Sequence, residues 1–210
     1  MKQNACTQVI ALKMQSRELC RLFKAQPKYT AVRSILFSFA LKKLGIECIY
    51  IDKNAADQDI DKAFKSNTKA VFGETIANPA LTVFDIERFA HIAHRHNVPL
   101  IVDNTFATPV LCKPIEYGAD IVIRSTSKYM DSHAVQIGGA IINSGNFDWT
   151  NGNFPDLTET DESYHGISYT ATYGRKAYIV KARMQLMRDF NVYPATSAAP
   201  PAMFSKSLHF

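Results

Sequence analysis

The sequence has few of the residues that mark specialised protein classes. Its 210 residues include only nine glycines, nine prolines and four cysteines. That is too little glycine and proline for a collagen-like or low-complexity chain, and too little cysteine for a small domain stapled by disulfides. The longest apolar run covers residues 35–41, whereas a membrane-spanning helix needs about 20 residues. We therefore expect no membrane partner.

Two absent motifs bear on the cellular setting of the protein and on the ligands that it could bind. The four cysteines, at positions 6, 20, 48 and 112, form no C-x-x-C pair, and no secretory leader is evident. A reducing, cytoplasmic setting is the expectation that follows. The sequence also lacks the G-x-G-x-x-G fingerprint, so a dinucleotide-binding protein is not favoured.

What the chain does have is the composition of a soluble globular protein, with 47% hydrophobic and 20% charged residues. Its net charge of +5 is unevenly placed, because residues 1–43 hold nine of the 24 basic residues and only one of the 19 acidic ones. A nucleic-acid arm or a transit peptide is one interpretation of this segment. A divergent, partly helical start over residues 1–34 is favoured instead, since no nucleic-acid-binding motif accompanies the charge.

From residue 45 onward, short apolar runs alternate with amphipathic stretches. The predicted strands are 46–52, 70–73, 100–102, 121–123 and 138–142. The predicted helices are 57–66, a helix capped by Asp85 that ends before Asn97, and 173–190. Residues 145–172 are predicted to form a long loop, and residues 191–210 an irregular tail after a 35–190 core. This alternation predicts an α/β fold with a mostly parallel sheet and helices on both faces.

Polar side chains follow two of the predicted strands. Asp103 comes directly after residues 100–102, and Lys128 follows the next strand together with Ser125 and Ser127. Ligands of parallel α/β sheets bind beyond the carboxyl ends of the strands. An acid, hydroxyls and a lysine in that place suit pyridoxal phosphate, whose aldehyde, ring nitrogen and phosphate they would bind. From spacing alone, a solvated loop and a helix cap stay open as alternatives.

Four motifs carry a resemblance to a known family. They are E-T-I-A-N-P at 74–79, V-D-N-T-F-A-T-P at 102–109, G-A-D-I-V at 118–122 and S-T-S-K-Y at 125–129. The last three resemble the cofactor-lysine region of the Cys/Met-metabolism pyridoxal-phosphate family, and the first resembles that family's upstream substrate-side motif. In this order the match runs over residues 36–189. The resemblance implies the three-layer α/β/α large domain of fold-type I pyridoxal-phosphate-dependent transferases, here incomplete.

The resemblance also implies a role for six residues. Lys128 would be the catalytic lysine, which forms the Schiff base with the cofactor and moves protons on the substrate. Asp103 would pair with the pyridinium nitrogen, and Thr105 would lie against the ring face. The other implied contacts are Ser125 and Ser127 to the phosphate, and Asn78 near the phenolic oxygen and the substrate carboxylate.

Residues 147–152, 154–155 and 164–166 most resemble the O-acetylhomoserine sulfhydrylase branch of the family. The implied reaction is γ-replacement, in which sulfide or methanethiol takes the place of acetate on O-acetylhomoserine and gives homocysteine or methionine. The resemblance further implies a small amino-acid substrate, a homo-oligomer (dimer or tetramer) and no nucleic-acid partner. Two alternatives are a γ-lyase of the cystathionine or methionine type, and a catalytically silent fragment that pairs with full-length homologues.

The resemblance is imperfect near the expected cofactor. The family's ring-stacking tyrosine would fall near Thr30, and its Gly-Gly-His-Gly after the lysine is replaced by D-S-H-A at 131–134. Two glycines that permit close backbone approach are lost, and Asp131 places a negative charge near the phosphate. Family segments before and after the matched region are also missing. The expectation is a truncated chain with weak cofactor binding and little or no activity.

Two further features have an ordinary and a functional interpretation. His91 and His94 share one face of a predicted helix and could hold a metal, but a solvated helix end is favoured and no metal site is expected. Trp149 either lines an entrance or subunit interface, or packs in the core.

Overall fold

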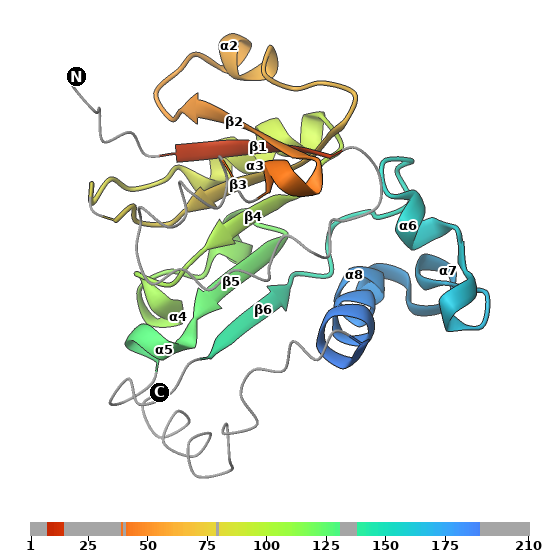
Figure 1. Ribbon diagram of the computed structural model, residues 1–210. Coiled ribbons are helices and arrows are strands. Elements are labelled where there is room, and N and C mark those ends of the chain that lie inside the picture. The colour runs from red at the N-terminus through yellow and green to blue at the C-terminus, as the bar shows by residue number, and fades with distance from the viewer. Residues whose placement is uncertain (1–7, 15–38, 40, 79, 131–137, 190–210) are drawn as a thin grey trace.

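The computed structural model describes residues 8–14, 39, 41–78, 80–130 and 138–189. These residues build a six-stranded sheet with the strand order β2-β1-β3-β4-β5-β6 (Figure 1). The strands are β1 (Gln8–Met14), β2 (Ile46–Asp52), β3 (Thr68–Glu74), β4 (Leu100–Asp103), β5 (Ile121–Ser125) and β6 (Gly139–Asn143). A separate two-stranded ribbon consists of β7 (Thr160–Asp161) and β8 (Ile167–Ser168).

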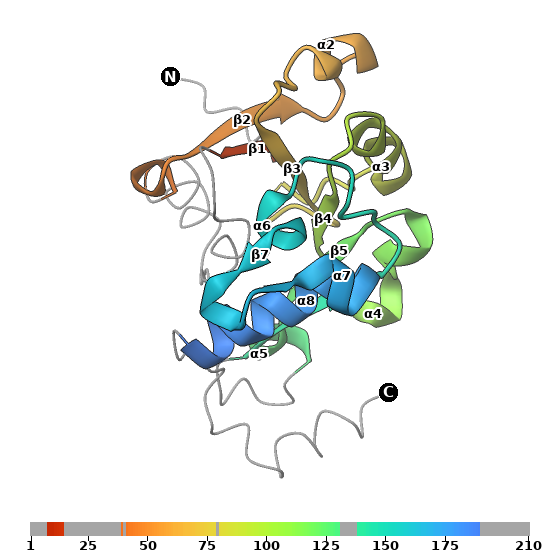
Figure 2. The ribbon, with the colours of Figure 1, turned by 90° about the vertical axis from the view of Figure 1, so that its right-hand side faces the viewer.

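Most of the helices are short. The α-helices are α2 (Asp57–Asp61), α3 (Ile86–Arg95), α4 (Thr108–Leu111), α5 (Thr126–Tyr129), α6 (Pro155–Thr158), α7 (Tyr169–Tyr173) and α8 (Ala177–Lys181). Single 3₁₀ turns lie at Lys42–Leu44, Pro114–Tyr117, Glu162–Tyr164 and Gly174–Lys176, and a π-helical stretch, Ala182–Asp189, continues α8. Figure 2 views the molecule from the side of α7 and α8. Among the described helices, none has the length and apolar character that a bilayer crossing requires.

The sheet is mostly parallel, as the sequence predicts. The strands β3, β4 and β5 pair in parallel. Because β2 and β3 are both antiparallel to β1, β2 runs in the same direction as β3. Only β1 and β6 run the other way. The α/β fold class is therefore confirmed.

Within the N-terminal segment for which the sequence predicts a partly helical start, the described residues form a strand, β1. Residues 8–14 are extended and lie between β2 and β3. The pairing with β2 runs from Gln8 opposite Asp52 to Met14 opposite Ile46. Although the segment is basic, its residues 9–12 are apolar and suit a strand.

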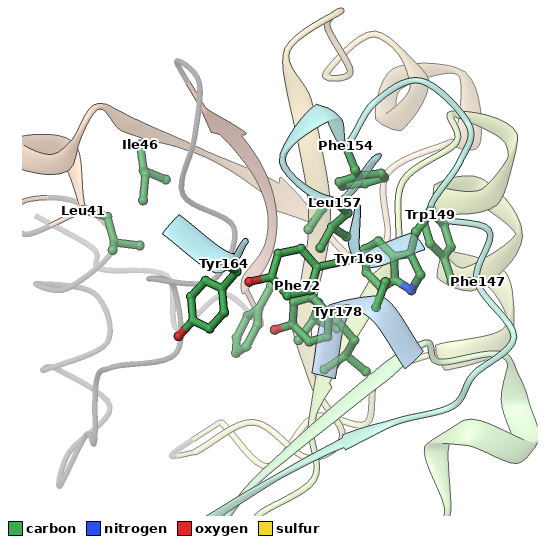
Figure 3. Close-up of a cluster of buried hydrophobic side chains, with 14 residues drawn as sticks. Leu41, Ile46, Phe72, Phe147, Trp149, Phe154, Leu157, Tyr164, Tyr169 and Tyr178 are labelled. Carbon is green, nitrogen blue, oxygen red and sulfur yellow. The ribbon is translucent and has the colours of Figure 1, made fainter. Parts of the chain in front are cut away.

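An aromatic core covers one face of the sheet (Figure 3). Phe72 of β3 and Ile101 of β4 are the contributions of the central strands to this core. Trp149 is only 2% exposed, and its ring stacks on Tyr178 of α8 with the ring centroids 5.1 Å apart. The interpretation of Trp149 as a core residue is thus confirmed, because an entrance residue would retain exposed surface.

The other face of the sheet packs against α3. Asp85 caps this helix, since its Oδ1 accepts a hydrogen bond of 3.1 Å from the Arg88 backbone N–H. The predicted apolar helix face is buried as a whole: Ile86, Phe89, Ala90 and Ala93. Alternate residues of the central strands meet the helix, for example Leu100 and Val102 of β4. Helical and aromatic layers on opposite faces give the predicted three layers.

Three predicted elements differ in extent. The helix predicted over 57–66 ends at Asp61. The predicted loop over 145–172 instead contains α6, β7 and β8. Lys181 of α8 holds α6 and β7 by donating to the Asp156 carbonyl at 2.9 Å and to Asp161 Oδ2 at 3.2 Å. The helix predicted over 173–190 is interrupted at Gly174, which has a φ of 55°. The tail at 191–210 lies outside the described residues.

Candidate cofactor site

The candidate site lies where the three central strands end. Because β3, β4 and β5 are parallel, their carboxyl ends meet at one edge of the sheet. The last residues of these strands are Glu74, Asp103 and Ser125. α5 begins directly after β5 at this edge, and Figure 1 shows it beside the end of the sheet. The topology thus brings two of the predicted site segments, at 103–105 and 125–128, to one place.

Asp103, Thr105 and Ser125 form a connected set. Asp103 is only 7% exposed, and its Oδ1 accepts a hydrogen bond of 2.9 Å from the Thr105 backbone N–H. The Thr105 hydroxyl accepts a 2.8 Å bond from the Ser125 backbone N–H. Thr105 therefore ties the end of β4 to the end of β5. This contact differs from the ring-face role that the resemblance implies for Thr105, which stays a prediction.

Lys128 and Ser127 lie on α5. The Lys128 side chain is exposed, whereas Asp103 is buried. The Ser127 hydroxyl accepts a 2.6 Å bond from the Gly138 backbone N–H and lies 3.2 Å from the Gly138 carbonyl oxygen. This hydroxyl therefore holds the start of β6 in the present structure. Its predicted contact with a phosphate would require these bonds to be shared or exchanged.

Asn78 lies in the segment that follows β3. Its side chain is exposed, and its backbone N–H donates a long bond of 3.4 Å to Glu74 Oε2. Asn78 is placed near the same edge by its position after β3, but its predicted contact with the cofactor remains a prediction. Thr30 and the divergent segment at 131–134 lie outside the described residues.

Two buried residues beside Asp103, namely Asn104 and Thr75, were not predicted from the sequence as part of the site. Asn104 is fully buried, and its Oδ1 accepts a 2.8 Å bond from the Thr75 hydroxyl. The Asn104 amide donates to the carbonyl oxygens of Thr108 and Cys112, at 2.9 and 2.8 Å. The polar character of Asn104 directly after a strand was the available signal, but its partner Thr75 lies 29 residues away in sequence.

Two histidines at the C-terminal end of α3, His94 and the C-cap His96, pair with carboxylates. His94 Nε2 lies 2.8 Å from Asp120 Oδ2, and His96 Nε2 lies 2.7 Å from Asp61 Oδ1. The hydrogen bond to Asp120 raises the pKa of His94, against the opposing effect of desolvation. Over the described ranges, no three His, Cys, Asp or Glu side chains are grouped as metal ligands.

A surface pocket of the molecule lies away from the candidate cofactor site. It is lined by Phe64, Lys65, Ser66, Thr68, His96, Asn97 and Asn153. Thr68 begins β3, so this pocket lies at the opposite end of that strand from the candidate site. Its position does not coincide with any of the predicted site residues.

Comparison with known proteins decides the family. The sequence profile described as "Cys/Met metabolism PLP-dependent enzyme" matches residues 24–164, more than half of the chain. The chain belongs to this family. The Cys/Met metabolism relatives that it resembles include the homocysteine/cysteine synthase of Saccharomyces cerevisiae, at 43% identity over 73% of the chain. The O-acetyl-L-homoserine sulfhydrylase of Corynebacterium glutamicum is 40% identical over 78% of the chain.

Solved structures of Cys/Met metabolism enzymes share the fold. A Campylobacter jejuni protein described as an O-acetylhomoserine (thiol)-lyase has a TM-score of 0.75 and 30% identity, over 85% of this chain and 43% of that one. It contains a lysine that carries a pyridoxyl phosphate group. The O-acetylhomoserine sulfhydrylase of Wolinella succinogenes has a TM-score of 0.69 and 26% identity, over 89% and 48% of the two chains.

The match covers only part of each relative. The chain spans about a third of the length of the curated relatives named here, 35% and 38% respectively. The range matched by the family profile, residues 24–164, includes the strand ends at Asp103 and Ser125. The resemblance to the Cys/Met-metabolism family and its sulfhydrylase members is thereby confirmed at the level of family and fold.

The residues present can be compared with the family's cofactor, pyridoxal phosphate. A buried carboxylate at the end of β4 suits a protonated ring nitrogen, because a charge-assisted hydrogen bond is strongest away from water. A primary amine one strand further on suits an aldehyde. Asp103 and Lys128 provide these two groups at the same sheet edge. The donor set therefore fits the cofactor. The predicted phosphate contact of Ser127 fits least well, because its hydroxyl is already hydrogen-bonded to the Gly138 backbone.

Proposed function

We propose that this chain binds pyridoxal phosphate at the ends of β4 and β5 and takes part in γ-replacement on O-acetylhomoserine. Sulfide or methanethiol would form a bond to Cγ, and acetate would leave with the electrons of the Cγ–O bond. The products would be homocysteine or methionine. The arrangement of Asp103, Thr105 and Ser125 carries the proposal, because it fixes an acid beside the segment that bears Lys128. The names of the sulfhydrylase relatives support the choice of reaction.

Asp103 would act on the cofactor ring. When bound, pyridoxal phosphate supplies an electron sink that makes the Cα–H of an attached amino acid acidic. The Asp103 carboxylate would hold a proton on the ring nitrogen and so sustain that sink. The Thr105 N–H, at 2.9 Å, fixes the direction of one carboxylate oxygen. Burial of Asp103 excludes water that would compete for the same hydrogen bond.

Lys128 would bind the cofactor aldehyde through Nζ and, once released by the substrate, take the proton from Cα. A lysine acts as a base near neutral pH when it is desolvated or faces another positive charge. The described residues leave Lys128 exposed. We therefore propose that this chain alone binds the cofactor weakly and turns over substrate slowly or not at all.

A second candidate is a catalytically silent chain that pairs with other family members. Apolar side chains are exposed on the elements beside the site: Val110 is 72% exposed, Leu111 76% and Tyr129 60%. Surfaces of this kind favour association. We propose a homo-oligomer, or a complex with a longer relative, formed in the cytoplasm. Light scattering of the purified chain tests the first, and co-purification with a tagged relative tests the second.

The cofactor proposal is tested by absorbance. Pyridoxal phosphate is added to the purified chain, and the visible band of lysine-bound pyridoxal is titrated. The Lys128→Ala variant should lose the band. Lys113→Ala is the matched control, because Lys113 is an exposed lysine that pairs with Glu116 at 3.4 Å outside the site. A band that persists in Lys128→Ala, or no band in the parent chain, would overturn the proposal.

Product analysis then separates the reactions. The chain is supplied with cofactor, O-acetylhomoserine and sulfide, and homocysteine is measured together with 2-oxobutyrate. Homocysteine indicates replacement and 2-oxobutyrate indicates γ-elimination. A band without either product would support the silent alternative.

A further inference from the structure

The fully buried amide of Asn104 joins three elements around the candidate site. Its oxygen binds the Thr75 hydroxyl beyond the end of β3, and its nitrogen binds two carbonyl oxygens, those of Thr108 and Cys112, at either end of α4. Three hydrogen bonds satisfy nearly all of the polar capacity of this amide. Such a network is rigid, because breaking any one bond would leave a polar atom buried without a partner.

The same network fixes the backbone on both sides of the Asp103 peptide. The Asp103 carbonyl accepts a 3.0 Å bond from the Thr75 N–H, and the Asn104 N–H donates a 2.9 Å bond to the Ile123 carbonyl. Thr75 thus contributes its backbone to Asp103 and its hydroxyl to Asn104. The strand end that bears the carboxylate is held from β3 and from β5 at once.

The segment after Asn104 also needs this support. Thr108 has a φ of 60°, a left-handed conformation that a β-branched residue rarely adopts. The Asn104 amide donates to the carbonyl oxygen of this residue. Backbone strain of this kind persists only where surrounding contacts determine it, and it is concentrated near functional sites. The strained turn closes the short loop in which Thr105 binds Asp103 Oδ1.

We propose that Thr75 and Asn104 are positioning residues that hold the Asp103 carboxylate for the ring nitrogen of the cofactor. The inference rests on the proposed function, but it concerns residues to which no role in the site has been assigned. Neither side chain needs to touch the cofactor. Their effect passes through the Asp103 peptide and through the loop that places the Thr105 N–H.

The test compares variants of Thr75. Thr75→Val has nearly the same shape but lacks the hydroxyl donor, whereas Thr75→Ser keeps it. Thr68→Val is the matched control, because Thr68 is also buried, accepts a bond from the Lys65 N–H at 3.0 Å, and lies at the opposite end of the same strand. Hydrogen exchange of single amides by NMR and the titration of the lysine-bound pyridoxal band are measured for each.

In Thr75→Val we expect the amides of Asn104, Thr105 and Ser125 to exchange faster and cofactor affinity to fall, each by roughly three- to tenfold. Thr75→Ser should restore both quantities, and Thr68→Val should leave both unchanged. Amides of α3 serve as the internal reference for a general loss of stability.

Unchanged exchange at the three amides in Thr75→Val would overturn the proposal. Faster exchange with an unchanged cofactor affinity and band would overturn it as well, since the pair would then be merely structural. If the parent chain gives no Lys128-dependent band, the proposed function fails and the positioning role fails with it, whereas a band in the parent chain with unchanged exchange or affinity in Thr75→Val overturns the positioning role alone.

Discussion

The pair of His94 and Asp120 should make the stability of the fold depend on pH near neutrality. Asp120 is 2% exposed and also accepts a 2.8 Å bond from the Leu100 backbone N–H at the start of β4. Its carboxylate therefore joins α3, β4 and β5. Because this hydrogen bond raises the pKa of His94 above its ordinary 6.5, protonated His94 stabilises the folded chain.

The sign of this pH dependence follows from the raised pKa of His94, and its size follows from the exposure of the His94 side chain. The stabilisation is fully present below pH 6.5, the unfolded value, and is lost as the pH rises through the higher folded pKa. A hydrogen bond to a charged group contributes about 1.5–3 kcal/mol when buried. The His94 side chain is 42% exposed, so solvent screening reduces this to about 0.5–1 kcal/mol.

Urea unfolding at a series of pH values measures this contribution. Asp120→Asn keeps an oxygen for the Leu100 N–H but removes the charge, so the loss of stability through this pH range should disappear. His91→Gln, a change at an exposed position on the same helix, should leave it in place. If Asp120→Asn retains the full pH dependence of the parent chain, the assignment to this pair is wrong.

Two further predictions concern the core. Gly73→Ala should reduce the free energy of unfolding by about 1–3 kcal/mol in urea titrations, because a Cβ at this position would lie 2.6 Å from the Phe84 ring. An unchanged midpoint would show that Phe84 can move aside. Burial raises the pKa of the Cys48 thiol to about 12, so Cys48 should react with iodoacetamide much more slowly in the folded chain than in urea at a pH near 8.5. Equal rates, followed by mass spectrometry, would contradict the burial.

The sequence predicted the elements whose signals are local. The bounds of β2 are those expected, and Asp85 caps α3 as its position before the apolar face indicates. Asp103 and Ser125 lie at strand ends as predicted, because short apolar runs followed by polar residues locate the ends of buried strands. The motif resemblance added the cofactor, which spacing alone left open.

The rest depends on contacts between distant segments. Strand β1 pairs with residues that come much later in the chain, so its own composition could not place it. The bond of Asn104 to Thr75 spans 29 residues and joins the ends of β3 and β4, and no pattern within one element predicts it. The exposure of Lys128 likewise depends on what covers α5, which the residues around it do not specify.

Strand β1 has a consequence for assembly of the sheet. Within the described sheet, the outer strand β2 pairs only with β1. During synthesis β1 emerges before β2 and β3, so it cannot pair until both have been made. In a chain lacking residues 8–14, the edges of β2 and β3 that pair with β1 would have unpaired backbone N–H and C=O groups. A synthetic heptapeptide of that sequence should bind there by β-strand addition.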